Sequence, residues 1–307
     1  MAASDLPAPL VRSCLCLLAA ARVICPETGG TLAEERDSSL RQWQFHDLFF
    51  HARSRLGRHD EGFGGTFRFR EAIPPLPATR RPISEDAVTL PRPDLAACAA
   101  RDPPLTRVME SRRSHRRHGK QPITLEQLGE FLFRVARIKD VIPADPAKRR
   151  FYETSRRPYP SGGATYDLEL YLTIGRCEGL LSGLYHYDAL GHRLCRISGL
   201  NKMTDLLMEG ARLAAKTSSP PQVLITLTSR FQRLSWKYET IAYATTLKNV
   251  GVLYQTMYLV ADAMNLAPCA LGGGHSDLFV RATGNDYVTE SSVGEFMLGT
   301  RDEDGPG

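Results

Sequence analysis

AYATTLKNVGVLYQTMYLVADAMN, residues 242–265, is a long and mostly apolar run, which predicts a buried helix. CALGGG follows at 269–274, and its apolar start and three glycines predict a strand that ends in a turn. Before the helix, the apolar run QVLITLTSRF at 222–231 predicts a buried strand. Similar patterns predict strands at 168–174, 183–188 and 293–301 and helices at 105–113, 122–138, 202–215 and 276–284. The chain after residue 104 therefore alternates between helices and strands.

The first 104 residues differ from the rest in composition. Residues 1–39 contain helix-like apolar spacing that is typical of part of a small winged-helix-like unit. Residues 40–104 begin with an aromatic- and arginine-rich segment, for which we predict a helix and then a short strand at TFRFR, residues 66–70. They end in a proline-rich stretch at 73–104, which predicts a linker that wraps over a surface because proline removes donors and favours extended backbone. Residues 105–307 form the main domain.

The composition excludes several functional classes. The 307-residue chain has a net charge of +5, and ESRRSHRRHGK at 110–120 suits one phosphorylated ligand better than a nucleic-acid groove. The apolar stretch at 10–25 is interrupted by arginines and is too short to cross a membrane. The seven cysteines have no metal-ligand spacing and most have apolar neighbours, so we expect no metal site and interpret them as buried free thiols of a cytoplasmic protein.

Three segments contain candidate ligand-binding residues. Arg112, Arg113, Ser114 and Arg116 place guanidinium groups and a hydroxyl where they could bind a phosphate, although a solvated charged loop has the same composition. Pro160, Ser161, Gly162 and Gly163 would let backbone approach a flat ligand, or they form a simple tight turn. The third segment is the turn at the end of a predicted strand, where ligands often bind, and it comprises Leu271, Gly272 and Gly273.

Lys237 and Tyr238 form an adjacent pair directly after the predicted strand at 222–231. Neighbouring residues in a regular helix or strand face different directions. The pair is therefore either an exposed lysine beside a packed tyrosine or two proton-handling groups at a pocket, since a partly desolvated lysine changes its pKa readily. The residues themselves leave both interpretations open.

The order of these motifs resembles the SagB-type azoline dehydrogenases of the nitroreductase superfamily. The resemblance covers residues 105–300 and rests on RRSxR, PSGGATYDLELYL, GLYHYD, SRFxRxSWKYETIAY and VGEFMLG. It implies an α+β fold with a mixed, largely antiparallel sheet flanked by helices, and an intertwined homodimer. It also implies FMN, held by Arg112, Arg113, Ser114, Arg116 and Arg301 at its phosphate and ribityl chain and by the two glycine-containing segments at its ring.

The resemblance further implies a reaction. Enzymes of this kind oxidise peptidyl thiazoline or oxazoline rings to thiazoles or oxazoles, and either Lys237 or Tyr238 matches the base that removes the ring proton. The substrate would be a ribosomal precursor peptide or a carrier-bound intermediate, and residues 1–39 match only part of the family's peptide-binding region. We therefore expect a cyclodehydratase or carrier protein as a partner. The alternatives are a general NAD(P)H-dependent nitro or quinone reductase and a non-catalytic scaffold subunit.

Overall fold

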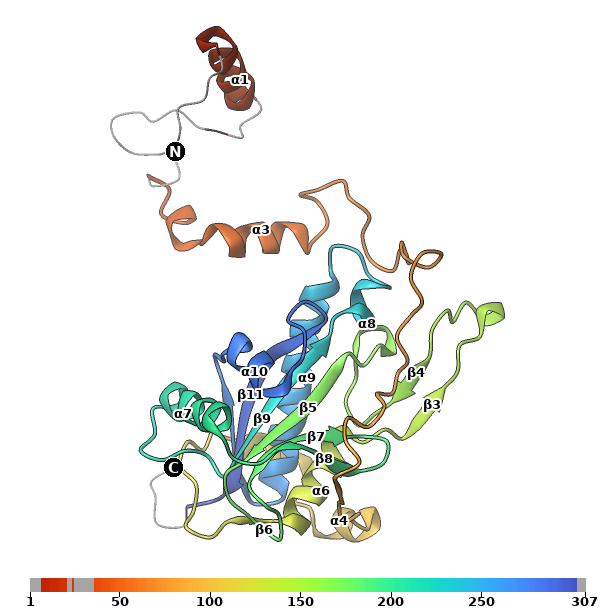
Figure 1. Ribbon diagram of the computed structural model, residues 1–307, viewed down its shortest axis with the longest axis vertical. Helices are drawn as coiled ribbons and strands as arrows, with labels where there is room; N and C mark the ends of the chain where they lie inside the picture. Colours follow the sequence, from red (N-terminus) through yellow and green to blue (C-terminus); the bar gives the residue numbers. More distant parts are fainter. Residues whose placement is uncertain (1–6, 21–23, 25–35, 303–307) are drawn as a thin grey trace. The chain divides into compact units, whose positions relative to one another are not determined.

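The computed structural model describes residues 7–20, 24 and 36–302, and the chain divides into two units, Met1–Asp60 and Glu61–Gly307. The first unit contains α1 (Ala8–Ala20), the 3-10 helix η1 (Leu40–Gln42) and α3 (Phe45–Arg53) (Figure 1). The helix expected near the aromatic segment is α3, in which His51 stacks on Trp43 with ring centroids 5.6 Å apart. The winged-helix-like unit expected at 1–39 includes residues 1–6, 21–23 and 25–35, which lie outside the described residues.

A seven-stranded sheet forms the centre of the second unit. Its spatial order is β1-β8-β7-β5-β9-β11-β10, and every neighbouring pair is antiparallel. The strands are β1 (Ala87–Thr89), β5 (Leu168–Ile174), β7 (Gly183–Asp188), β8 (Arg193–Ser198), β9 (Val223–Arg230), β10 (Leu266–Leu271) and β11 (Glu290–Thr300). Small pairs add β2 (Ile123–Thr124) parallel to β6 (Cys177–Glu178), and β3 (Asp140–Ile142) antiparallel to β4 (Thr154–Arg156). The predicted fold class is confirmed.

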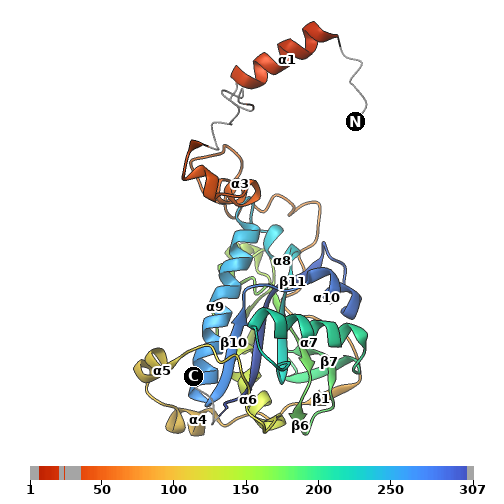
Figure 2. The same ribbon diagram turned by 90° about the vertical axis from the view of Figure 1, so that its left-hand side faces the viewer.

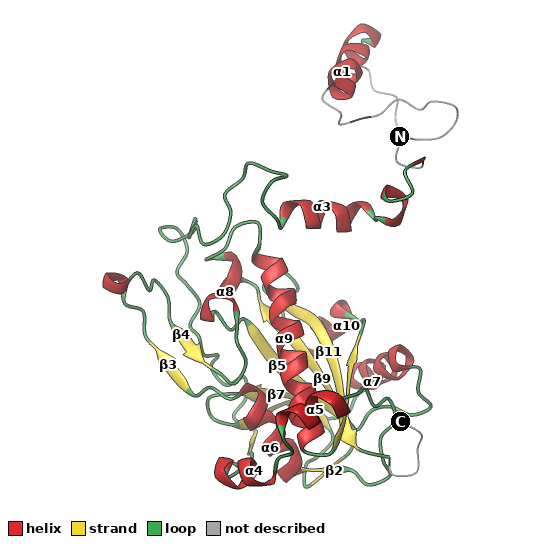
Figure 3. Cartoon of the chain, turned by 180° about the vertical axis from the view of Figure 1, so that it is seen from behind, coloured by secondary structure: helices red, strands yellow, loops and turns green. Residues whose placement is uncertain are grey.

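Helices cover both faces of this sheet. One face carries α5 (Leu105–Ser111), α6 (Leu125–Ala136) and the long helix α9 (Ala242–Ala263), which Figure 3 shows lying across the strands. The opposite face carries α7 (Lys202–Ala215) and α10 (Ser276–Thr283), as the side view in Figure 2 makes clear. The predicted helices at 202–215, 242–265 and 276–284 are thus confirmed. Thr124 caps α6 by accepting a hydrogen bond from the backbone N–H of Gln127.

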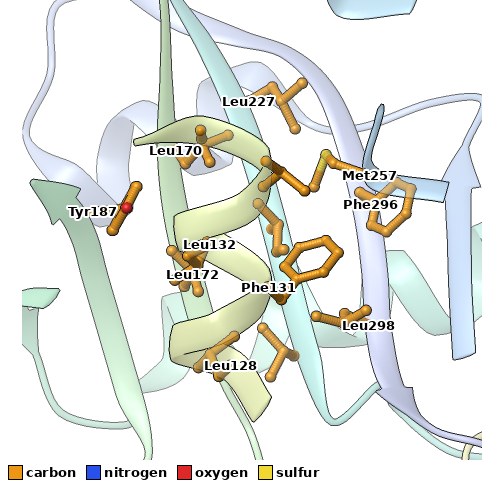
Figure 4. Close-up of a cluster of buried hydrophobic side chains, with 14 of the residues drawn as sticks. Leu128, Phe131, Leu132, Leu170, Leu172, Tyr187, Leu227, Met257, Phe296 and Leu298 are labelled. Atoms are coloured by element: carbon orange, nitrogen blue, oxygen red, sulfur yellow. The ribbon is translucent and has the colours of Figure 1, made fainter. Parts of the chain in front are cut away.

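Alternation along the central strands creates one core on each face. In β5, Leu170 and Leu172 point to the α6–α9 side, whereas Tyr171 belongs to the cluster under α7 and α10. Side chains at successive strand positions point to opposite faces, so a strand buried on both sides is mostly apolar, and the buried Glu169 of β5 is paired with His186 and Arg230. Figure 4 shows the first core, where Leu128, Phe131 and Leu132 of α6 meet the strands.

Two expectations for residues 61–104 need revision. The strand expected at 66–70 is wrong: the chain turns there, with Phe67 in a left-handed conformation at φ 55°. The proline-rich stretch does run over the surface, but it also contains β1, which pairs with β8, and α4 (Leu95–Arg101). The turn at 66–70 and the strand β1 depend on contacts with residues far away in the sequence, which local composition does not reveal.

The six cysteines at described positions are free, with Cys98, Cys195 and Cys269 buried but Cys14 and Cys16 exposed, contrary to the expectation of burial.

In the part of the chain that the structure describes, none of the helices combines the length and the apolar content that crossing a membrane requires.

Candidate active site

The side chains of Lys237 and Tyr238 come together at one place in the structure. They follow the short helix α8 (Gln232–Ser235), and both backbone N–H groups donate to the carbonyl of Leu234, at 3.1 and 2.7 Å. This tight turn frees the pair from the opposed directions of a regular strand. A Cβ atom built on Gly163 would overlap both Lys237 Nζ and Tyr238 Oη. The two side chains therefore converge on the glycine-containing segment at 160–163. This arrangement favours two proton-handling groups at a pocket over an exposed lysine beside a packed tyrosine.

The Lys237 side chain lies among aromatic rings. Its Nζ donates to Tyr152 Oη at 2.7 Å and lies 4.9 Å from the centroid of the Tyr238 ring. Burial lowers the pKa of Lys237 and raises that of Tyr238, because desolvation disfavours the charged form of each. A lysine with a depressed pKa is more available as a base near neutral pH.

The turn at 61–73 holds the backbone of this pair in place. Gly64 and Glu239 exchange two backbone hydrogen bonds, of 3.3 and 2.9 Å, and Phe67 N donates to Lys237 O at 3.2 Å. The Glu239 carboxylate accepts from Thr66 Oγ1 at 2.9 Å and pairs with Arg68 at 3.3 Å. The charge of Glu239 is thereby neutralised by partners in the turn.

A buried aspartate supports the segment at 160–163. Gly162 N donates to Asn249 Oδ1 at 3.0 Å, and Asn249 Nδ2 donates to Asp167 Oδ1 at 2.7 Å. Ser229 and Thr246 donate to the other oxygen of Asp167, at 2.7 and 3.1 Å. Burial raises the pKa of Asp167, while these donors favour its carboxylate. Ser161 accepts from the backbone of Tyr166 at 3.1 Å, and Pro160 is exposed.

Replacing Asp167 by leucine is expected to lower the free energy of unfolding by about 3 kcal/mol, because three buried donors lose their acceptor. Urea unfolding monitored by circular dichroism would measure the change. Thr173→Val is the matched control in the adjacent strand, since the buried Thr173 hydroxyl has no partner in the structure; its change should stay below about 1 kcal/mol. Equal effects of the two substitutions would contradict the role of Asp167 as the hub.

The arginine-rich segment lies beside the edge strand β10 and the far end of α9. His115 N donates to Pro268 O at 2.8 Å, which aligns the segment with β10. Ser114 Oγ lies 2.7 Å from Tyr258 Oη, and the Arg112 guanidinium lies 5.2 Å from the centroid of the Tyr258 ring. Arg113 and Arg116 are exposed. The segment thus presents guanidinium groups to solvent from an anchored backbone.

The glycine turn at 271–274 separates two cavities of about 280 Å³ each. One is lined by Tyr243 and Tyr254 of α9 together with Leu271, Gly272 and Gly273 and the start of β11. The other lies beneath α7 and is mainly apolar. Glu295 contributes to both cavities, and burial raises the pKa of its carboxyl group.

Arg301 is held at the end of α9. Its Nη2 donates to Asp262 Oδ1 at 2.7 Å and its Nε donates to Leu266 O at 3.0 Å. Ser111 Oγ donates to the other oxygen of Asp262 at 2.6 Å. Arg301 therefore lies near the start of the arginine-rich segment, with its charge partly neutralised by Asp262.

The structure brings the predicted residues together in two groups on opposite faces of α9. Gly162 meets α9 at Thr245 and Asn249, whereas the glycine turn and Ser114 meet it at Tyr254 and Tyr258. Thr245 and Tyr254 are nine residues apart, as are Asn249 and Tyr258, and that spacing is about two and a half helical turns. Pro160 to Gly163, Lys237 and Tyr238 form one group. The other contains Arg112, Ser114, Leu271, Gly272, Gly273 and, at the helix end, Arg301.

Sequence reasoning missed four residues of these groups: Tyr152, Asp167, Asn249 and Glu295. Asp167 and Glu295 carry a weak signal, because each is an acidic residue within or next to an apolar strand pattern. Tyr152 and Asn249 carry none, since their roles depend on contacts between distant segments.

The model of the nitroreductase family matches residues 109–299, nearly all of the sheet and its helices. The chain belongs to the nitroreductase family. A second model, of the cyanobactin oxidase ThcOx, matches residues 4–60. The family assignment agrees with the fold and accounts for the motifs from the arginine-rich segment to the last strand.

Three relatives carry informative names. A Methanocaldococcus jannaschii protein named as a nitroreductase is 24% identical over 61% of this chain and 85% of its own length. The microcin B17-processing protein McbC of Escherichia coli is 30% identical over 42% of this chain and 48% of that protein. The trifolitoxin-processing protein TfxB of Rhizobium leguminosarum is 29% identical over 37% of this chain and 31% of that protein. The matches to the two processing proteins thus span half of their lengths or less.

Solved structures agree with the fold. A nitroreductase-like protein of Anabaena variabilis superimposes with a TM-score of 0.57 at 20% identity, covering 82% of this chain and 45% of that one. A chain of the Escherichia coli microcin synthetase McbBCD complex gives a TM-score of 0.51 at 20% identity, covering 83% and 92%. At these identities the likeness establishes the fold of the nitroreductase family.

Proposed function

We propose that this nitroreductase-family chain is an FMN-dependent dehydrogenase that oxidises thiazoline or oxazoline rings of a peptide to the aromatic azoles. The observation that carries the proposal is the convergence of Lys237 and Tyr238 on Gly163. A simple reductase receives its hydride from a nicotinamide and does not require a substrate base beside its glycine segment. Similarity to proteins that process microcin B17 and trifolitoxin supports a peptide substrate.

The residues present fit FMN. The exposed guanidinium groups of the arginine-rich segment suit a phosphate, and the cavity beside Gly272 and Gly273 has a glycine wall that a planar ring can approach. Bound FMN would supply the acceptor for a hydride from the azoline ring. Arg112, Arg113, Ser114, Arg116 and Arg301 would hold its phosphate end, and Leu271 to Gly273 would lie against its ring. Because Pro160 to Gly163 lie on the opposite face of α9, they would reach the same ring from the second copy of a homodimer.

The chain's own chemistry is proton removal and positioning. Loss of one proton and one hydride converts an azoline into an azole, so a base must take the proton from the ring carbon next to the carbonyl group. Lys237 as the neutral amine can accept this proton, and Tyr238 Oη, which lies beside it at Gly163, can donate a hydrogen bond to the developing negative charge. The half-buried site limits the water that competes for the amine.

We further propose that a homodimer completes the site. The two groups of residues lie on opposite faces of α9, and an exposed stripe of that helix lies between them. The stripe contains Leu247, Gly251 and Val252 together with the polar Lys248 and Gln255, and its apolar side chains and glycine allow close approach. A second copy covering it would adjoin both groups. A cyclodehydratase or carrier protein would then deliver the azoline-bearing peptide in the cytoplasm.

Anaerobic mixing of the purified yellow protein with a thiazoline-bearing peptide tests the function. Bleaching of the flavin absorbance, with one thiazole formed per flavin, is the expected result. Bleaching only by NADPH would instead identify a nitro or quinone reductase. A colourless protein that does not take up FMN would identify a scaffold subunit. The same experiment with an oxazoline peptide would define the ring preference.

Arg116→Ala is expected to weaken FMN binding about tenfold or more, because a charge-assisted hydrogen bond to phosphate is lost. Fluorescence titration of the apoprotein with FMN would measure the dissociation constant. Arg117→Ala is the control, since Arg117 is also exposed and removes the same charge from the same segment. An equal loss in both variants would mean that only the overall positive charge matters.

A further inference from the structure

Tyr152 accepts a hydrogen bond from the Lys237 ammonium group at 2.7 Å, and nothing in the sequence pattern marked it. It lies two residues before β4 and is buried. Its ring packs against Trp236 and Phe67, with centroids 6.0 and 6.4 Å away. These contacts hold the phenol in one place between the turn at 61–73 and α8.

A hydrogen-bond chain runs from Lys237 through Tyr152 to Gly163. Lys237 Nζ donates to Tyr152 Oη at 2.7 Å, and Tyr152 Oη donates to Gly163 O at 2.7 Å. A second, longer contact joins Lys237 Nζ directly to Gly163 O at 3.4 Å. A phenol has a single proton. Because Gly163 O takes that proton, Tyr152 Oη can only accept from Lys237.

We propose that Tyr152 is a positioning residue that orients Lys237 for proton abstraction; this inference rests on the proposed role of Lys237 as the base. A neutral amine has two N–H donors and one lone pair. With the donors directed to Tyr152 Oη and Gly163 O, the lone pair is the only position of Nζ left for a substrate proton. Tyr152 thus determines the direction from which Lys237 can accept a proton.

The neighbouring charged groups are engaged with other partners, so Tyr152 is the main hydrogen-bond acceptor for Lys237. The Arg233 guanidinium lies 5.7 Å from the centroid of the Tyr152 ring and donates to the backbone carbonyl of Thr165. Glu239 is paired with Arg68, and Tyr238 is a neutral phenol. Burial raises the pKa of Tyr152 to about 12, so its hydroxyl remains protonated in the working pH range.

Tyr152→Phe tests the proposal through the titration of Lys237. The variant keeps the ring between Phe67 and Trp236 but removes an acceptor that favours the ammonium form. The pKa of Lys237 should therefore fall by about one pH unit relative to the wild type. Acylation of Lys237 by an amine-reactive reagent, followed across pH by mass spectrometry on the full chain, would measure it. A rise toward the ordinary lysine value would indicate that the tyrosine merely excludes water, and would overturn the proposal.

Azoline oxidation gives the second readout. In Tyr152→Phe, the plateau value of kcat above the pKa of Lys237 should fall about tenfold or more, the ascending limb of kcat should move to lower pH, and KM should stay within about twofold. Unchanged kcat would overturn the proposal. If the wild type does not oxidise azolines at all but the Lys237 titration still shifts, the proposed function fails while the coupling between Tyr152 and Lys237 stands.

Tyr185→Phe is the matched control, because Tyr185 Oη also donates to a backbone carbonyl, that of Leu181, at 2.8 Å. It lies in β7, away from the pair, and neither readout should change. If Tyr152→Phe does not fold, 3-fluorotyrosine at position 152 retains the ring and the hydroxyl but makes the oxygen a poorer acceptor. It should shift the Lys237 titration in the same direction by a smaller amount, and no shift would overturn the proposal.

Discussion

Replacing Lys237 by methionine is expected to slow azoline oxidation by about a thousandfold, while the protein keeps its flavin. General base catalysis by a positioned side chain contributes roughly 10²–10⁴-fold, and the variant has no other amine at this position. Methionine is unbranched and fills the space between the Tyr152 and Tyr238 rings without a cavity. Rapid mixing under anaerobic conditions would measure the rate of flavin bleaching in a single turnover.

Lys202→Met is the control for this substitution, because Lys202 is exposed at the start of α7 and loses the same charge. It should bleach at the wild-type rate. Equal rates for Lys237→Met and the wild type at saturating substrate would remove Lys237 from the mechanism and leave Tyr238 as the base. Loss of flavin from Lys237→Met would instead place the lysine in cofactor binding.

Gly163→Ala is expected to reduce kcat by about a hundredfold and to lower the free energy of unfolding by about 1–2 kcal/mol. Gly163 has φ +62°, a left-handed conformation that costs any residue with a Cβ atom. The added methyl group would also overlap Lys237 Nζ and Tyr238 Oη and displace both. Steady-state kinetics and urea unfolding of the same preparation would separate the two effects.

Gly284→Ala is the control that separates backbone strain from displacement of the Lys237 and Tyr238 side chains. Gly284 ends α10 at φ +76°, and a Cβ atom there would have no neighbour within 4 Å. The Gly284→Ala substitution should also lower the free energy of unfolding, by about 1 kcal/mol, but should keep full activity. If Gly163→Ala lost no more activity than Gly284→Ala, the convergence at Gly163 would have no part in catalysis.

The sequence predicted the elements of the main domain well, and the reason is physical. β5 and β9 are buried on both faces, so both are rich in apolar residues, and α6 has a clear cap at Thr124. Their antiparallel pairing came only from the family resemblance, because periodicity carries no information on partners. The turn at 66–70 was mistaken for a strand, since its alternating TFRFR pattern is overridden by backbone contacts to Lys237 and Glu239.

The candidate site was only partly predictable. Glycines and arginines are visible as residue types, and so is the Lys237–Tyr238 pair. Their grouping on two faces of α9 depends on the pairing of distant strands and could not be seen. Tyr152 and the Asp167 hub were invisible for the same reason, because their partners lie from 62 to 85 positions away in the chain.

The two edge strands of the seven-stranded sheet, β1 and β10, affect how readily the protein can aggregate. An edge strand exposes unpaired N–H and C=O groups, which another chain can use to extend the sheet. At one edge, β1 has three residues and lies within the proline-rich stretch. At the other edge, β10 carries Pro268, which lacks an N–H group and whose carbonyl accepts from His115. Proline at both margins thus makes the sheet a poor template for intermolecular β-pairing, so a stretch of sequence that looks like a passive linker also helps to protect the protein from aggregation.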